Sequence, residues 1–136
     1  MSKYVDLAEE AKMISNGMDG VVIRHYGSGI IGGRVLDMTD FAGTAIQAGH
    51  LVIRVADESG NYTYKPMPVS GNAYGSLPAN HEYAGVVVCS KPASEALVGI
   101  MDDGRVNDKA MPYQFADDTQ RAAVKTALPN LIFEHD

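Results

Sequence analysis

The chain has 136 residues, and its 17 acidic and 11 basic side chains give a formal net charge of -6 at pH 7. A chain of this length is typical of one domain with one sizeable core, and an apolar fraction of 46% excludes wholesale disorder. Because the basic residues are few and scattered, the charge pattern disfavours binding to nucleic acid or to an anionic membrane.

Residues 1–34 are predicted to form a partly flexible N-terminal arm, separate from a domain at residues 35–136. Within the arm, residues 7–14 have the spacing of a short helix and residues 21–26 that of a strand. Four of the seven positions 27–33 are glycine, which raises the entropy cost of ordering and favours an arm that becomes fixed only against a partner. The alternative is a flexible β-hairpin at the edge of the domain.

The strongest strand pattern follows. Residues 50–56 and 62–65 are rich in β-branched and aromatic side chains and are separated by a polar turn with Gly60, so they predict a hairpin. Gly49 supplies the turn before the first strand. Pro66 and Pro68 cannot donate to a sheet, so we expect this segment at an edge, and residues 70–78 are predicted to be a loop.

The last third adds two strands and one helix. Residues 83–89 are predicted to be a central strand, residues 97–101 another, and residues 102–104 a tight turn. Asp117 or Asp118 can cap a helix over residues 119–128 that Pro129 ends, and residues 131–133 predict a final strand. The predicted fold is mainly β with one short C-terminal helix, a compact β-tulip-like or barrel-like domain.

The sequence contains few side chains in patterns typical of catalytic or metal-binding sites. Cys89 is the only cysteine, which excludes an internal disulfide, and we expect a small apolar residue on a strand there. The four histidines lack metal-ligand spacing, so the sequence predicts no metal and no cofactor. A hydrolase remains an alternative, in which His81 and Asp102 meet Ser90 or Ser94, but no activated-serine motif is present and we expect no enzyme.

A binding domain is another alternative. Tyr62 and Tyr64 fall on the same face of one strand, and with Tyr74 and Tyr83 they could form a platform for carbohydrate or peptide. Packing between neighbouring strands is the simpler interpretation of the same tyrosines, and we favour it.

The order of features resembles one family. It comprises an alanine-glycine turn into a strand (residues 48–52), a tyrosine, lysine and proline run after a glycine turn (60–66), a glycine-led strand (84–88), a strand at 98–106, and a terminal helix followed by a strand. Across residues 43–133 this pattern is similar to the head decoration proteins of tailed bacteriophages, the lambda-type capsid-stabilising family. The glycine-rich arm and the loop at 70–78 depart from that pattern.

The resemblance implies a virion protein that is made in the host cytoplasm. It would sit as a homotrimer on the outer capsid surface and grip the major capsid protein with its N-terminal arm. An extended arm can add a strand to an exposed sheet edge, and three arms on one trimer would act together. The residues expected to bind the capsid are Val21, Val22, Ile23 and Tyr26. An acidic protein that avoids packaged nucleic acid fits this location.

Overall fold

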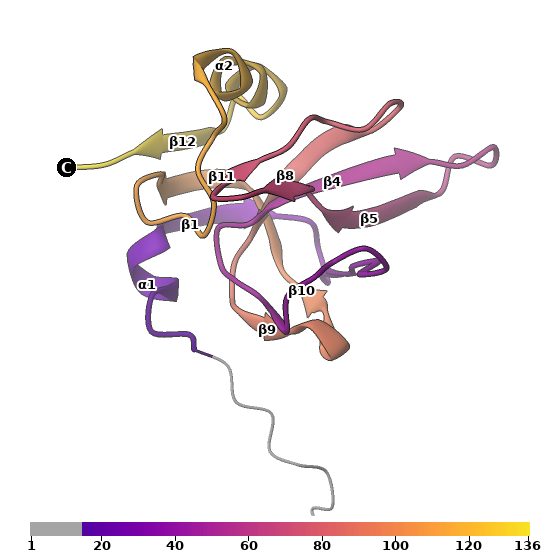
Figure 1. Ribbon diagram of the computed structural model, residues 1–136, viewed down its shortest axis with the longest axis horizontal. Coiled ribbons are helices and arrows are strands. Elements are labelled where there is room, and N and C mark those ends of the chain that lie inside the picture. Colours follow the sequence, from indigo (N-terminus) through magenta and orange to yellow (C-terminus); the bar gives the residue numbers. More distant parts are fainter. Residues whose placement is uncertain (1–14) are drawn as a thin grey trace, which may run out of the picture.

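The computed structural model describes residues 15–136 and shows a mainly β protein with one helix near the C-terminus (Figure 1). The predicted helix at 7–14 and the first part of the predicted arm, residues 1–14, lie outside the described residues. A six-stranded sheet forms the centre, in the order β1-β11-β8-β4-β5, and β12 pairs with β11 in parallel. The fold class expected from the sequence is confirmed.

The elements of the large sheet are β1 (Ile23–Gly29), β4 (Leu51–Ala56), β5 (Tyr62–Pro66), β8 (Glu82–Val87), β11 (Ile100–Asn107) and β12 (Leu131–Glu134). Three small sheets surround it and are formed by β2 (Arg34–Val35) with β10 (Leu97–Val98), β3 (Ala45–Ile46) with β9 (Lys91–Pro92), and β6 (Val69–Ser70) with β7 (Ala73–Tyr74). The helical elements are α1 (Asp19–Val22), the 3-10 turn η1 (Ala93–Glu95) and α2 (Asp118–Ala127). No helix within residues 15–136 combines the length and the apolar character needed to cross a membrane.

The predicted hairpin and the predicted central strand are both confirmed. Strands β4 and β5 pair antiparallel, and β8 lies between β11 and β4. Strand β5 occupies the edge of the sheet, where the missing N–H of Pro66 costs no ladder hydrogen bond. Gly49 adopts a positive φ of 88°, so the turn before β4 forms as expected.

The core covers both faces of the sheet, because successive side chains of a strand point to opposite sides. On β4, Leu51 and Ile53 join a core cluster that includes Val124 of α2, whereas Val52 joins a second cluster with Val98 of β10. Figure 1 shows α2 over one face and β9 and β10 beneath the other.

Helix α2 forms and is capped as the sequence indicated. The Asp117 side chain accepts a hydrogen bond of 2.8 Å from the backbone N–H of Gln120, which satisfies a donor of the first turn. The buried Val124 anchors the helix to the sheet, and Leu131 then begins β12. The predicted final strand is therefore confirmed.

Three local predictions were wrong. Residues 102–104 do not turn but continue β11, because Gly104 at φ 156° lets the strand pass close to the backbone of His25 while its neighbours stay extended. Cys89 is exposed and lies beyond the end of β8 rather than on a strand. The segment 70–78 is more ordered than a plain loop, because β6 and β7 form a short hairpin that buries Tyr74 to 1% exposure.

Candidate functional site

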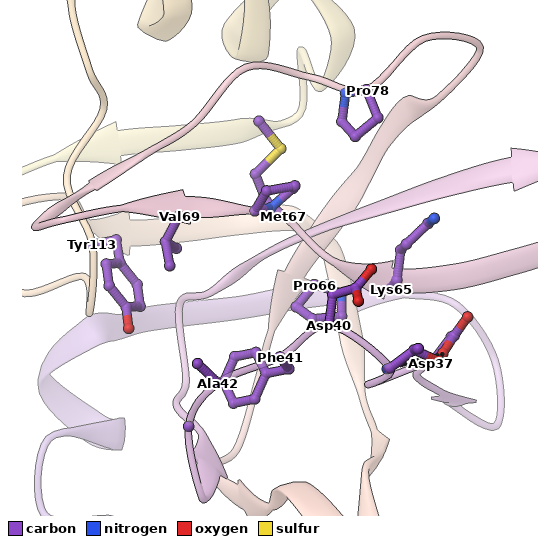
Figure 2. A pocket seen from close by; sticks show the side chains of 13 residues that line it. Asp37, Asp40, Phe41, Ala42, Lys65, Pro66, Met67, Val69, Pro78 and Tyr113 are labelled. Atoms are coloured by element: carbon purple, nitrogen blue, oxygen red, sulfur yellow. Dashed lines mark hydrogen bonds between the residues drawn. The ribbon is translucent and has the colours of Figure 1, made fainter.

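A pocket of about 460 Å³ lies beside the β5 edge of the sheet (Figure 2). Pro66, Pro68 and Pro78 form part of its lining, so we call it the proline-walled pocket. In the view of Figure 2, Tyr113 lies at one end and Lys65 at the other. This volume falls in the range of roughly 300–1,000 Å³ that small-ligand and side-chain sites occupy.

Charged groups gather in the part of this pocket that follows β2 in the chain. Asp37 accepts hydrogen bonds from the backbone N–H of Thr39, at 3.1 Å, and from its hydroxyl. These two bonds, with a smaller contribution from the charge of Lys65, lower the pKa of Asp37. Asp40 is exposed and, within residues 15–136, forms neither a hydrogen bond nor an ion pair. The carboxylate of Asp40 is thus the uncompensated charge of the pocket.

Phe41 and Tyr113 supply the aromatic rings of the pocket, and both pack on the buried His50. The His50 ring lies 5.9 Å from Phe41 and 5.4 Å from Tyr113, both edge to face, and its Nε2 lies 3.0 Å from the carbonyl oxygen of Met67. Burial lowers the pKa of His50 to about 4, so the imidazole is neutral at pH 7. The two rings therefore rest on a rigid, uncharged support.

No pattern in the sequence predicted this pocket. Its members come from the segment after β2, the end of β5, Pro78 and Tyr113, which are distant in the chain. Spacing rules recognise neighbours along one element and cannot bring these segments together. A cluster of polar residues at Asp37, Thr39 and Asp40 is visible in the sequence, but it reads equally well as a turn.

The four residues predicted to bind the capsid differ in how exposed their side chains are. Val21 and Tyr26 are 46% and 52% exposed, whereas Val22 is 2% exposed and Ile23 packs against the core. Residues 23–29 form β1, which pairs with β11 inside the large sheet. Residues 19–29 therefore belong to the domain and not to a separate arm, with Val22 buried and Ile23 partly buried in it.

A polar clasp holds α1 to the body. Ser90, which follows β8, donates its backbone N–H and its hydroxyl to the Asp19 carboxylate, at 2.8 and 2.6 Å. The same Ser90 oxygen accepts the backbone N–H of Ala48 at 3.0 Å. Ser90 therefore has a structural role, and its hydroxyl is not free to act as a nucleophile.

Several apolar side chains of residues 18–35 are nonetheless exposed. Of the nine large apolar residues that are exposed in the described chain, five lie between residues 18 and 35. They are Met18, Val21, Tyr26, Ile31 and Val35. We call residues 18–35 the apolar N-terminal segment. Exposed apolar side chains on one segment of the chain make that segment a candidate interaction surface.

The geometry also bears on the two alternative sites predicted from the sequence. Tyr64 and Tyr74 are only 7% and 1% exposed, so these two tyrosines lie in the core and cannot contribute to an exposed platform. Nδ1 of His81 lies 2.8 Å from the carbonyl oxygen of Ala79, while Ser90 is held by Asp19. The triad of His81 with Ser90 is therefore not formed.

A second polar cluster lies near the C-terminus and joins β12 to α2. Asp108 is 4% exposed and accepts hydrogen bonds from Arg121 and, at 2.7 Å, from Nδ1 of His135. These hydrogen bonds outweigh burial, so the pKa of Asp108 is lowered. Arg121 also donates to the carbonyl of Phe133 at 3.0 Å, which makes the cluster a structural tie.

Within residues 15–136 no three metal-ligating side chains gather into a group that could hold an ion. The chain matches no protein-family profile, no curated protein and no solved structure.

Proposed function

We propose that this chain is a virion structural protein that decorates and stabilises the outside of a phage capsid as a homotrimer. The apolar N-terminal segment is the surface that contacts the major capsid protein. Its exposed apolar side chains carry the proposal. Covering them with a partner protein would remove their apolar surface from water, which favours association even for an acidic protein. The mainly β fold with one C-terminal helix is also the fold that the family resemblance implies.

The contact residues differ from those the sequence indicated. Val21 and Tyr26 remain from the predicted set, the exposed Met18 joins them, and the buried Val22 and the partly buried Ile23 are no longer anchors. The clasp between Asp19 and Ser90 and the pairing of β1 with β11 fix their positions before binding. Preorganised anchors lose less entropy on docking than a free arm does.

The test uses purified protein and expanded capsids of its phage. Light scattering measures the mass in solution, where three chains of 14.5 kDa each are expected. Electron microscopy of the mixture then shows density on the outer surface at local threefold positions. A monomer at every concentration, together with capsids that remain bare, would refute the proposal.

A pair of double variants identifies the contact surface. Val21→Ser with Tyr26→Ser removes two anchors, and we expect capsid affinity to fall at least about tenfold, since each buried apolar anchor contributes about 1 kcal/mol or more. Ile132→Ser with Tyr62→Ser removes side chains of similar exposure, 44% and 45%, elsewhere on the protein. This control should bind as the wild type does, and equal losses in both variants would contradict the assignment.

A further inference from the structure

The proline-walled pocket is lined by two carboxylates, Asp37 and Asp40, by one cation, Lys65, and by the aromatic rings of Phe41 and Tyr113. Asp40 makes no ion pair within the described residues, and Phe41 follows it directly in the chain. Lys65 acts on Asp37, whose carboxylate is already held by Thr39. Figure 2 shows Asp40 and Phe41 between the Lys65 end and the Tyr113 end. The pocket lining therefore carries one more negative than positive charge, together with the rings of Phe41 and Tyr113.

At two other places in this protein, an arginine contacts both an aromatic ring and a carboxylate. The guanidinium of Arg54 lies 4.0 Å from the ring centre of Tyr62 and donates to Glu82 at 2.7 Å. The guanidinium of Arg121 lies 5.6 Å from the ring centre of Phe115 and pairs with Asp108. A planar guanidinium suits both partners at once, because it stacks on a ring and donates two parallel hydrogen bonds to a carboxylate.

We propose that the proline-walled pocket binds an arginine side chain from an extended segment of a partner protein. The guanidinium pairs with Asp40 and stacks against Phe41 or Tyr113, while the aliphatic stem of the arginine lies along Pro66 and Pro68. The charge of the pocket favours a cationic ligand. The chain as a whole carries a formal net charge of -6, and the charges of Asp37, Asp40 and Lys65 sum to a negative pocket. This inference rests on the proposed function in one respect, since it takes the capsid protein as the source of the arginine.

The first experiment tests the pocket without any capsid. A blocked tetrapeptide of sequence alanine-arginine-alanine-alanine is titrated into the full chain, and NMR follows the ring signals of Phe41 and Tyr113. The same peptide with citrulline, which has the shape of arginine without its charge, is the matched ligand. We expect both rings to shift with the arginine peptide and the citrulline peptide to bind about tenfold more weakly.

Variants then test whether the Asp40 carboxylate and the Phe41 ring bind the peptide. Asp40→Asn should abolish the preference for arginine over citrulline, whereas Glu58→Gln, which removes the same charge from the exposed β4–β5 turn, should leave it intact. Phe41→Leu keeps an apolar residue against His50 and should weaken both peptides. Thermal melts of the three variants verify that each is folded.

Three results would overturn the inference: equal binding of both peptides, no shift at either ring, or a neutral disaccharide such as cellobiose shifting the same signals while the arginine peptide does not. The capsid mixture distinguishes this inference from the function. If capsids bind the wild type and Asp40→Asn equally well, the proposed function stands and the pocket has another role. If capsids bind neither protein while the arginine peptide still prefers the wild type, the capsid proposal fails and the arginine site remains.

Discussion

Tyr74→Phe is the sharpest test of how the core is held together. Tyr74 is 1% exposed, and its hydroxyl accepts the backbone N–H of Leu51 at 2.9 Å and faces the carbonyl of Gly49 at 3.4 Å. Phenylalanine preserves the ring but leaves the buried N–H of Leu51 without a partner. An unsatisfied buried donor costs about 1–3 kcal/mol, so we expect a loss of about 2 kcal/mol. At about 4 °C per kcal/mol, the Tm falls by about 8 °C.

The measurement is urea unfolding at pH 7 followed by far-UV circular dichroism, since the chain has no tryptophan. Tyr113→Phe is the matched control: its ring lies 5.9 Å from that of Tyr74, but its hydroxyl makes no hydrogen bond within residues 15–136. We expect the control to stay within about 0.5 kcal/mol of the wild type. If Tyr74→Phe costs no more than the control, the hydroxyl does not hold the start of β4 and the reasoning is refuted.

Two further predictions concern the same core. The folded-state pKa of His50 is about 4 against 6.5 when unfolded, so the unfolded chain takes up the proton first as the pH falls. Stability from His50 is full above pH 6.5 and is lost toward pH 4, and we expect wild type to lose about 3 kcal/mol more than His50→Gln between pH 7 and pH 4. Gly49→Ala would set a methyl 2.3 Å from Cγ1 of Val22 at φ 88°, while Gly60→Ala at φ 85° meets open space. Urea unfolding should show a cost of about 1 kcal/mol for Gly60→Ala and about 3 kcal/mol for Gly49→Ala, and equal costs would mean that Val22 is not locked against this turn.

Local patterns predicted the elements whose cause is local. The β4–β5 hairpin, the central β8 and the Asp117 cap of α2 each follow from side chains within a few residues, and all three are confirmed. The continuous β11 could not be foreseen, because Asp102, Asp103 and Gly104 form a turn in most settings. What keeps them extended is pairing on both sides, with β1 along one edge and with β8 and then β12 along the other.

The candidate site was less accessible to sequence reasoning than the fold. Neither Asp40 nor Tyr113 stands in a recognisable motif, and the pocket exists only because β5 brings Lys65 and Pro66 beside the segment that follows β2. One contact that creates this arrangement is a backbone bond of 2.8 Å from the N–H of Asp37 to the carbonyl of Tyr64. Backbone hydrogen bonds between distant segments cannot be predicted from the spacing of residue types.

The glycines of the apolar N-terminal segment explain why residues 23–29 belong to the sheet. A Cβ on Gly27 would lie 2.6 Å from the carbonyl oxygen of Asp103, and one on Gly29 would lie 2.0 Å from that of Ile100. These positions exclude side chains because β1 bulges against β11 there, so the glycines permit close packing and do not signal a loose arm. The entropy cost of ordering these glycines is therefore offset by sheet pairing within the chain, and the exposed Val21 and Tyr26 lie in or directly beside a strand fixed to the sheet.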